Sequence, residues 1–265
     1  MGMTAPDLAE ASLLAERRGG VAVLTLNRPQ RLNALTAPML ETFLRELDVA
    51  EADPGVGSLL VRAAGRGFCA GADLREFSTG GAAEQAMMRD LLNPLILRLA
   101  RSRLPVVCAV NGPAAGAGAG LALAGDVVLG TPQADLHLAF ARIGAVPDAG
   151  TSWSVPAQLG LARALPLFLL GGTIPAAEAL AHGLYWRLAE PAALEAEAMA
   201  VAARLADGPR RATARTKALL RGGDVLAGRL DAELALQAAC FGDAEMAEGV
   251  AAFREGRTAD FRRAP

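Results

Sequence analysis

The stretch Gly65-Arg66-Gly67-Phe68-Cys69-Ala70-Gly71-Ala72-Asp73-Leu74 follows an apolar segment and is rich in small residues. A second stretch of the same kind comes later in the chain, Ala109-Val110-Asn111-Gly112-Pro113-Ala114-Ala115-Gly116-Ala117-Gly118-Ala119-Gly120-Leu121. Each pattern predicts a strand that ends in a turn of glycines and alanines and opens a helix, where backbone N–H groups stay unpaired. Two such turns facing each other would hold one oxygen between two backbone donors, which predicts an oxyanion hole.

Strand and helix patterns alternate through most of the chain. The predicted strands cover residues 20–26, 58–63, 105–110 and 126–129. One helix is predicted to begin after Thr36, its N-cap, and another covers residues 82–102 with an interruption near Asn93-Pro94. Strands that alternate with helices predict an α/β fold around a mainly parallel, buried sheet.

The last part of the chain carries no strand pattern. Segments rich in Ala, Leu, Glu and Arg predict helices over residues 192–206, 210–221, 228–241 and 243–256. This region is too thin to form a core of its own, so its apolar positions are expected to pack on the same chain or on another subunit. We therefore predict an α/β core over residues 1–195 and a C-terminal helical region over residues 196–265 for oligomer packing.

The composition predicts a folded protein without a nucleic-acid or membrane partner. The 265 residues are 52% hydrophobic, and the net charge is −2, which argues against a general nucleic-acid binder. Residues 104–125 are uncharged, but prolines and glycines in this run favour a strand, a turn and a buried helix over a membrane span. Three well-separated cysteines and the lack of a signal-peptide pattern near Met1 predict a cytoplasmic protein.

Several other chemistries find little support in the sequence. The second turn has the spacing G-x-G-x-G rather than G-x-G-x-x-G, and no G-x-x-x-x-G-K-[ST] occurs, so no nucleotide cofactor is expected. His137 and His182 lack metal-ligand spacing, so no metal is expected. Cys69 has no histidine linked to it by local sequence and is interpreted as structural. The serine-hydrolase pattern G-x-S-x-G is absent.

One carboxyl group lies in a largely apolar stretch, Arg142-Ile143-Gly144-Ala145-Val146-Pro147-Asp148-Ala149-Gly150. Pro-Asp-Ala-Gly is a β-turn pattern, so Asp148 could be a solvated side chain in a surface turn. Apolar residues follow the turn, however, and a carboxyl group with apolar neighbours has a raised pKa and can exchange protons near neutral pH. The pattern alone leaves both interpretations of Asp148 open.

These motifs, in this order, resemble the crotonase (enoyl-CoA hydratase/isomerase) superfamily. The resemblance runs from Leu24-Thr25-Leu26-Asn27-Arg28-Pro29 to Glu248-Gly249-Val250-Ala251-Ala252-Phe253, and the stretch from Gly67 to Leu74 is highly specific. It implies a spiral of ββα units with a C-terminal helical trimerisation region, and a homotrimer or a dimer of trimers. It further implies an acyl-CoA thioester as substrate, with coenzyme A present as part of the substrate and no separate cofactor.

The resemblance also implies catalytic roles. The thioester oxygen would lie between the backbone N–H groups of Ala72 and Ala117, where the charge of an enolate develops. Hydratases of the family use two glutamates around one water, but the matching positions here hold Gly120 and Phe140, which cannot transfer a proton. Asp148 matches the catalytic aspartate of isomerase-type relatives. Its surroundings resemble most the 1,2-epoxyphenylacetyl-CoA isomerase branch.

The resemblance implies the substrate-binding residues less specifically than the catalytic ones. Each arginine among them could equally be an ordinary solvated charge, and Asp73 is expected to brace the first turn rather than to do chemistry. Arg254 or Arg257 would accompany Phe253 at the adenine end of coenzyme A. The implied substrate-binding residues are Arg28, Arg31, Asn33, Ala34, Ala70, Gly71, Asp73, Leu74, Gly116, Phe140 and Phe253.

Three functions follow as hypotheses. The first is an isomerase that moves a proton or a double bond in an acyl-CoA, with 3-enoyl or ring-epoxide phenylacetyl substrates, and uses Asp148 as acid and base. The second is an enoyl-CoA hydratase or another lyase of the same family that uses an unidentified group. The third is a non-catalytic acyl-CoA-binding scaffold, which would bind such esters without turnover.

Overall fold

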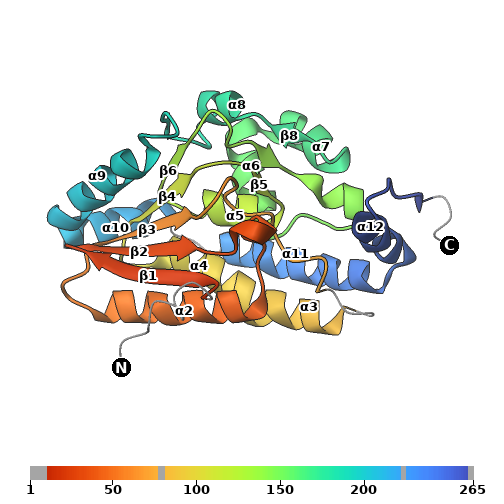
Figure 1. Cartoon of the computed structure of the whole chain (residues 1–265), viewed down its shortest axis with the longest axis horizontal. Coiled ribbons are helices and arrows are strands. Elements are labelled where there is room, and N and C mark those ends of the chain that lie inside the picture. Colours follow the sequence, from red (N-terminus) through yellow and green to blue (C-terminus); the bar gives the residue numbers. More distant parts are fainter. Residues whose placement is uncertain (1–10, 77–80, 222–224, 262–265) are drawn as a thin grey trace.

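The main sheet is parallel except at one edge. In the computed structural model, which describes residues 11–76, 81–221 and 225–261, its strand order is β1-β2-β3-β4-β6-β9 (Figure 1). β1 pairs with β2 in antiparallel fashion, and the other neighbours are parallel. The strands are β1 (Leu13–Arg18), β2 (Val21–Leu26), β3 (Ser58–Ala63), β4 (Val106–Val110), β6 (Val127–Gly130) and β9 (Arg187–Leu188).

The central strands β3 and β4 are mostly apolar because both faces of the sheet are covered, although β3 begins with Ser58 and contains Arg62 near its end. On one face, Leu60 and Val107 pack in a cluster with Ala198 and Ala202 of α9 (Leu194–Asp207). The opposite face belongs to the larger core cluster, which includes buried residues of α2 (Ala37–Ala52) and α4 (Asn93–Arg101). Figure 1 shows α9 and α2 on opposite sides of the sheet. Burial on both faces explains why these strands lack polar alternation.

A second, small sheet of order β5-β7-β8 lies beyond the main one. The chain also forms several short helices. These elements are β5 (Ala114–Ala115), β7 (Leu136–His137), β8 (Thr173–Ile174), η1 (Pro29–Arg31), α5 (Ala117–Leu123), η3 (Ala139–Ile143), α6 (Thr151–Leu159), α7 (Leu161–Leu169) and α8 (Ala176–Ala181).

The helix expected over residues 82–102 is interrupted where the sequence predicts it. It consists of α3 (Ala82–Met87), a π-helical turn η2 (Met88–Leu92) and α4. The N–H of Asn93 donates to the carbonyl of Met88, five residues back. Pro94 has no N–H to continue the regular ladder, and such wide turns commonly accompany this kind of break.

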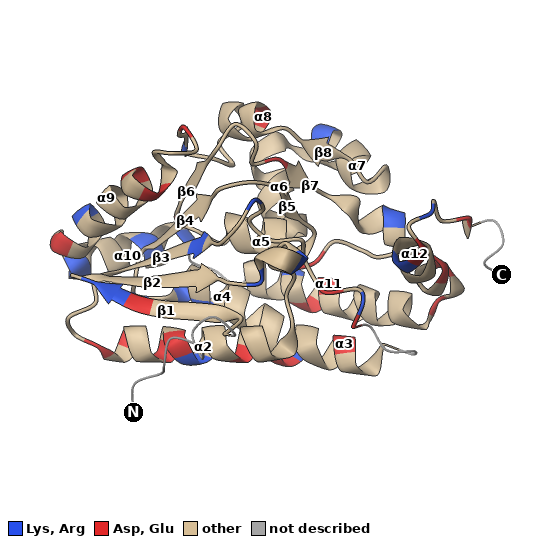
Figure 2. Ribbon diagram, viewed as in Figure 1, with Lys and Arg blue, Asp and Glu red and all other residues tan. Residues whose placement is uncertain are grey.

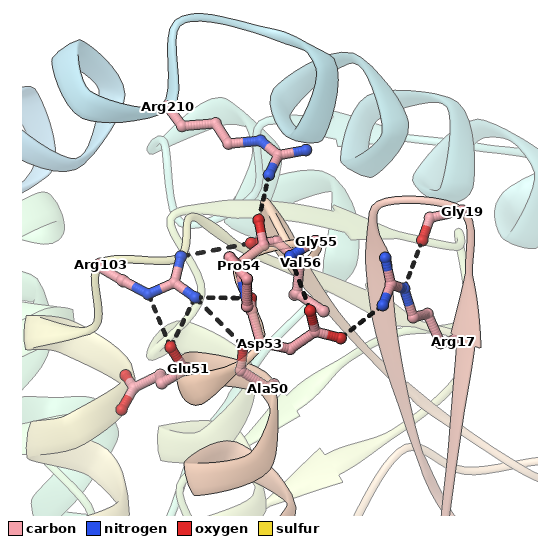
Figure 3. A network of polar contacts seen from close by, with 10 residues as sticks. All are labelled: Arg17, Gly19, Ala50, Glu51, Asp53, Pro54, Gly55, Val56, Arg103 and Arg210. Carbon is pink, nitrogen blue, oxygen red and sulfur yellow. Dashed lines mark hydrogen bonds and ion pairs between the residues drawn. The ribbon is translucent and has the colours of Figure 1, made fainter.

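Guanidinium groups from three separate segments hold the connection between α2 and β3 (Figure 3). Arg103 donates to the carbonyl oxygens of four residues, Ala50, Glu51, Asp53 and Val56. Arg17 of β1 pairs with Asp53, and Arg210 donates to the carbonyl of Pro54 at 2.9 Å. The last carbonyls of a helix lack intrahelical donors, so Arg103 acts as a C-terminal cap for α2.

Three further helices complete the C-terminal part, α10 (Arg210–Arg221), α11 (Val225–Gly242) and α12 (Ala244–Glu255). Lys217 of α10 is buried, and its Nζ donates to the carbonyls of Leu99 and Leu104 at 2.7 and 3.0 Å. The same Nζ lies 2.7 Å from a carboxylate oxygen of Asp126, which also pairs with Arg221. A buried charge network therefore ties α10 to the core.

The predicted α/β fold with a mainly parallel sheet is confirmed, and the four predicted C-terminal helices are present. The predicted boundary at residues 195 and 196 falls inside α9, which packs on the sheet, and the division into two regions stays a prediction. The uncharged run 104–125 forms β4, β5 and α5. In the described part of the chain, every helix is too short or too polar to cross a bilayer.

Candidate active site

The first glycine turn is hydrogen-bonded to the loop that contains Leu35. This pairing leaves one backbone N–H of the turn without an acceptor among the described residues. Leu35 donates to the carbonyl of Gly71 at 2.7 Å, and its own carbonyl accepts the N–H of Asp73 at 3.1 Å. In this parallel bridge, Ala72 lies between the two bonded residues, so its own N–H points to the opposite side. Among the described residues, the N–H of Ala72 has no acceptor.

The second turn supplies another free N–H beside the first. Gly116 is the N-cap of α5, and Ala117 is its first residue, whose N–H lies at a helix start and has no acceptor among the described residues. The two turns touch closely, because a Cβ built on Gly71 would lie 2.8 Å from the carbonyl oxygen of Ala115 and 3.4 Å from the amide nitrogen of Ala117. Gly71 also has φ +86°, which favours glycine.

A cavity of about 310 Å³ opens between these turns. It brings together both predicted oxyanion donors, Ala72 and Ala117, and the predicted acid, Asp148. Figure 2 shows mostly uncharged ribbon around α5, α6 and β5. The lining also includes the predicted binding residues Ala70, Gly71, Leu74, Gly116, Phe140 and Phe253.

Asp148 lies on the cavity wall just before α6, within a stretch that connects η3 to that helix. Its Oδ1 is buried and has no hydrogen-bond partner among the described residues. Burial raises the pKa of the Asp148 carboxyl to about 8, and the nearby charge of Glu233 adds to this effect. Of the two interpretations that the sequence left open, the structure favours the desolvated carboxyl over the solvated one.

The two positions where hydratases carry glutamates are filled differently here. Gly120 of α5 packs against Ala149, and a Cβ at this position would lie 2.5 Å from both the Cβ and the carbonyl oxygen of Ala149. Phe140 of η3 is buried, and its ring lies 3.7 Å from a Cβ built on Gly116. Ala149 therefore fills the space beside Gly120, and at the other position an aromatic ring stands in place of a carboxylate.

Five of the eleven predicted substrate-binding residues lie outside the cavity lining: Arg28, Arg31, Asn33, Ala34 and Asp73. Arg28 is only 16% exposed, and its guanidinium pairs with Asp73 at 3.0 Å and donates to the carbonyl of Ala34 at 2.7 Å. Arg28 and Asp73 therefore brace the first turn. Arg31 is exposed in η1. Substrate contact by these five residues stays a prediction.

Asn33 has a structural role that its sequence context did not reveal. It is fully buried with φ +55°, and its Nδ2 donates to the carbonyls of Ala64 and Gly67 at 2.9 and 3.0 Å. Its Oδ1 accepts the N–H of Arg28 at 2.8 Å. Asparagine tolerates this left-handed backbone better than most residues, so Asn33 fixes the early loop against the first turn.

Cys69 and His137 both have structural surroundings. Burial raises the pKa of the Cys69 thiol to about 12, so it stays protonated near neutral pH, in agreement with a structural role. The Nδ1 of His137 contacts the hydroxyl of Thr173 at 2.9 Å across the small sheet.

The two arginines expected near the adenine end of coenzyme A lie at the C-terminal end of α12 and just after it. Arg254 donates to the carbonyl of Leu74, and Arg257 pairs with Glu248 and Glu255.

Two polar residues of α11 near Asp148, Glu233 and Gln237, were not predicted from the sequence. Both are buried, at 4% and 5% exposure, and Gln237 lines the cavity. Their spacing contains a signal, because Leu226, Leu230, Glu233 and Gln237 share one face of a helix. A polar side chain on an otherwise buried face needs a partner, and here the partners are backbone groups around Asp148.

Comparison with known proteins identifies the family of this chain. The sequence model of the enoyl-CoA hydratase/isomerase family matches residues 16–264. The 1,2-epoxyphenylacetyl-CoA isomerase of Escherichia coli is 38% identical, covering 94% of this chain and 97% of that protein. A probable enoyl-CoA hydratase of Rhodobacter capsulatus is 40% identical, covering 91% of this chain and 94% of that protein.

The fold agrees as well. An enoyl-CoA hydratase from Mycobacterium avium subsp. paratuberculosis has a crystal structure that matches with a TM-score of 0.85 at 38% identity, covering 95% of this chain and 98% of that one. This match confirms the predicted crotonase-type α/β fold. The chain belongs to the enoyl-CoA hydratase/isomerase family, also called the crotonase family.

Proposed function

We propose that this enzyme is an acyl-CoA isomerase that shifts a proton, and with it a double bond, along the acyl chain of a coenzyme A thioester. The observation that carries the proposal is that Asp148, the one carboxyl group of the described cavity lining, lines the same cavity as Ala72 and Ala117, whose N–H groups have no acceptor among the described residues. Arg142, the other charged residue of the described lining, has a guanidinium that stays protonated in proteins.

The chemistry follows from the positions of these groups. The thioester oxygen is held between the N–H groups of Ala72 and Ala117, which stabilise the negative charge that develops when a proton leaves the neighbouring carbon. Asp148 accepts this proton as a carboxylate and returns it to the carbon two bonds further along the dienolate. The C=C bond thereby moves by one position, and the carboxylate is regenerated. Because the proton is returned, the reaction as proposed needs no cofactor or other reactant.

Several observations favour isomerisation over hydration. Addition of water in the manner of the family needs a pair of carboxylates around the water, and Gly120 and Phe140 occupy the matching positions. The nearby carboxylate of Glu233 is already used, because it accepts backbone N–H groups of Gly150 and Ser152. A pKa of about 8 lets Asp148 both lose and regain a proton near neutral pH.

The cavity supports an apolar acyl group. Phe140, Ile143, Met246 and Phe253 contribute most of its bulky side chains. Two relatives are named as isomerases, the 1,2-epoxyphenylacetyl-CoA isomerase of Escherichia coli and a trans-2-decenoyl-[acyl-carrier-protein] isomerase of Streptococcus mutans. We propose 3-enoyl esters and ring-epoxide phenylacetyl esters of coenzyme A as the two substrate types.

We further propose that the enzyme acts as a homotrimer or a dimer of trimers in the cytoplasm. Large apolar side chains are exposed on α7 and α10 of the single chain, and a subunit interface would bury them. They include Leu165 and Leu169 of α7, Leu170 directly after that helix, and Leu219 and Leu220 of α10, each at least 51% exposed. Analytical ultracentrifugation of the full chain tests this assembly, and a monomer at micromolar concentration would contradict it.

A substrate panel tests the proposed reaction. Purified enzyme is assayed with a straight-chain 3-enoyl-CoA, with crotonyl-CoA and with the ring epoxide of phenylacetyl-CoA. We expect turnover of the first or the third, and conversion of crotonyl-CoA to a 3-hydroxy ester slower by orders of magnitude. Fast hydration of crotonyl-CoA would favour a hydratase, and binding of all three esters without turnover would favour a scaffold.

The variant Asp148→Asn tests the assigned base. Because an amide cannot accept the proton, we expect kcat to fall by about 100-fold or more, while the acyl-CoA still binds. The exposed Asp231 of α11 provides the matched control, since Asp231→Asn makes the same change far from any proton transfer. Retained activity in Asp148→Asn would remove Asp148 from the reaction.

A further inference from the structure

Helix α11 forms hydrogen bonds to the loop that carries Asp148, both before and after Asp148 in the sequence. The Oε1 of Gln237 accepts the N–H of Val146 at 3.0 Å, two residues before Asp148. One helical turn earlier, Glu233 accepts the N–H of Gly150 at 2.9 Å and that of Ser152 at 3.1 Å. Residues 146–152 are therefore fixed to one face of α11 by three hydrogen bonds, one before Asp148 and two after it.

Glu233 differs from Gln237 because it brings a charge. Each of its two carboxylate oxygens accepts a backbone N–H at the start of α6, an arrangement that favours the ionised form. Burial raises the pKa of Glu233, and the hydrogen bonds from Ser152 and Gly150 act to lower it. The negative charge of Glu233 in turn adds to burial in raising the pKa of Asp148.

Few other charged groups lie around Asp148 and Glu233 in the described part of the chain. Arg142 of η3 lines the cavity that Asp148 faces, and Arg229 of α11 acts to lower the pKa of Glu233. Arg221 of α10 lies near Ala149 and Gly150 but is paired with Asp126. Within the described part of the chain, α5, α6 and α12 bring no charged side chain to the cavity lining.

We propose that Glu233 is a positioning residue for Asp148, because its carboxylate fixes the turn that carries Asp148 and places a second negative charge beside it. This inference rests on the proposed function, in which Asp148 carries the proton. The charge makes the ionised form of Asp148 less favourable and therefore a stronger base toward the weakly acidic carbon of a thioester. The two N–H contacts keep Asp148 at the cavity wall while its charge changes.

A titration of Asp148 tests the proposal without relying on turnover. The enzyme is labelled with carbon-13 at the aspartate side-chain carboxyls, and the Asp148 resonance is assigned by its absence in Asp148→Asn. In Glu233→Gln, we expect the midpoint of the Asp148 titration to fall by about one pH unit or more. We also expect kcat to fall about tenfold or more, because the introduced amide offers one acceptor oxygen for two N–H groups.

Two further variants separate charge from geometry. Asp231→Asn removes one negative charge from the exposed face of the same helix and should leave the Asp148 midpoint and kcat unchanged. Glu233→Asp keeps the charge, so the midpoint should stay within about half a pH unit, while its shorter side chain lowers kcat. If Glu233→Gln does not fold, unchanged kcat in Glu233→Asp would by itself overturn the positioning role.

The two proposals can fail separately. An unmoved Asp148 midpoint in folded Glu233→Gln would contradict the role of Glu233 even if the wild-type enzyme isomerises its substrate. Absence of turnover in the wild-type enzyme would contradict the proposed function, whereas the shift of the Asp148 midpoint could still be measured.

Discussion

At the scale of single residues, the site depends on one carboxyl group held in unfavourable surroundings. Asp148 has a buried oxygen without a partner among the described residues, and its neighbour Ala149 has φ +51°. Both features cost folding free energy. Functional sites commonly retain such costs, because a solvated aspartate would be too weak a base for a carbon acid. The strained backbone of Ala149 is therefore adjacent to Asp148, the residue proposed to transfer the proton.

The raised pKa of Asp148 predicts how the rate depends on pH. The proton-accepting form is the carboxylate, and the pKa of about 8 lies above the ordinary value of 3.8, so most Asp148 is protonated at pH 7. We expect kcat/KM for a 3-enoyl-CoA to rise about tenfold per pH unit up to about pH 8 and then to level off. A profile that is flat between pH 6 and 9 would contradict the assignment.

The same shift predicts a gain in stability when the carboxyl group is removed. As the pH rises from 3.8 toward 8, the unfolded chain releases the Asp148 proton while the folded chain retains it, so the folded state loses relative stability. The loss is at most about 1.4 kcal/mol per pH unit across this window. Urea unfolding should therefore show Asp148→Asn to be more stable than wild type at pH 7, with equal stability near pH 3.

At the scale of elements, α5 decides which chemistry the site can hold. Gly118 and Gly120 lie where the helix meets other backbone, since a Cβ on Gly118 would be 2.3 Å from the carbonyl oxygen of Cys69. This close approach brings the first residue of α5 next to the first turn. The hydratase glutamate cannot simply be restored at Gly120, because Ala149 occupies the space that its Cβ would need.

The variant Gly120→Ala tests this packing. The added methyl group must displace Ala149 and with it Asp148, so we expect kcat to fall and the free energy of unfolding to drop by about 1–3 kcal/mol. Gly228→Ala is the control, because Gly228 lies on the exposed face of α11 and no described atom outside its own stretch of helix lies within 4 Å of a Cβ built there. There the helix should gain stability, by about 0.5–1 kcal/mol. Full activity of Gly120→Ala would show that Ala149 does not hold Asp148 in place.

At the scale of the whole molecule, the C-terminal helices belong to the architecture of the site. α11 covers the loop with Asp148, and α10 is tied to the core by the buried Lys217. The C-terminal helices therefore help to build the candidate active site. Their anchorage to the core should determine how stably the catalytic loop is held.

The variant Lys217→Met tests this anchorage. It leaves the carbonyls of Leu99 and Leu104 without their donor and removes one partner of Asp126, so we expect a loss of about 3 kcal/mol in unfolding free energy. Arg215→Met, on the exposed face of the same helix, should change the value by less than about 0.5 kcal/mol. Equal stability of the two variants would show that the buried network does not anchor α10.

Much of this arrangement follows from local sequence patterns. Apolar runs and glycine turns predict the parallel sheet, and Asn93-Pro94 predicts the interrupted helix, because these features depend on neighbouring residues. The free N–H of Ala72 depends instead on a bridge to Leu35, far away in the chain. The roles of Arg28 and Asn33 as braces likewise depend on partners in distant loops. The role of Glu233 could not be predicted from local sequence either, since its partners are backbone groups about eighty residues earlier.

The most direct test of the account is a crystal structure of the enzyme with a bound enoyl-CoA. We predict that the thioester oxygen lies about 2.7–3.1 Å from the amide nitrogens of both Ala72 and Ala117. We also predict that a carboxylate oxygen of Asp148 lies within about 3.5 Å of the carbons between which the proton moves. A thioester oxygen that contacts neither amide, or an Asp148 turned away from the acyl chain, would contradict the account.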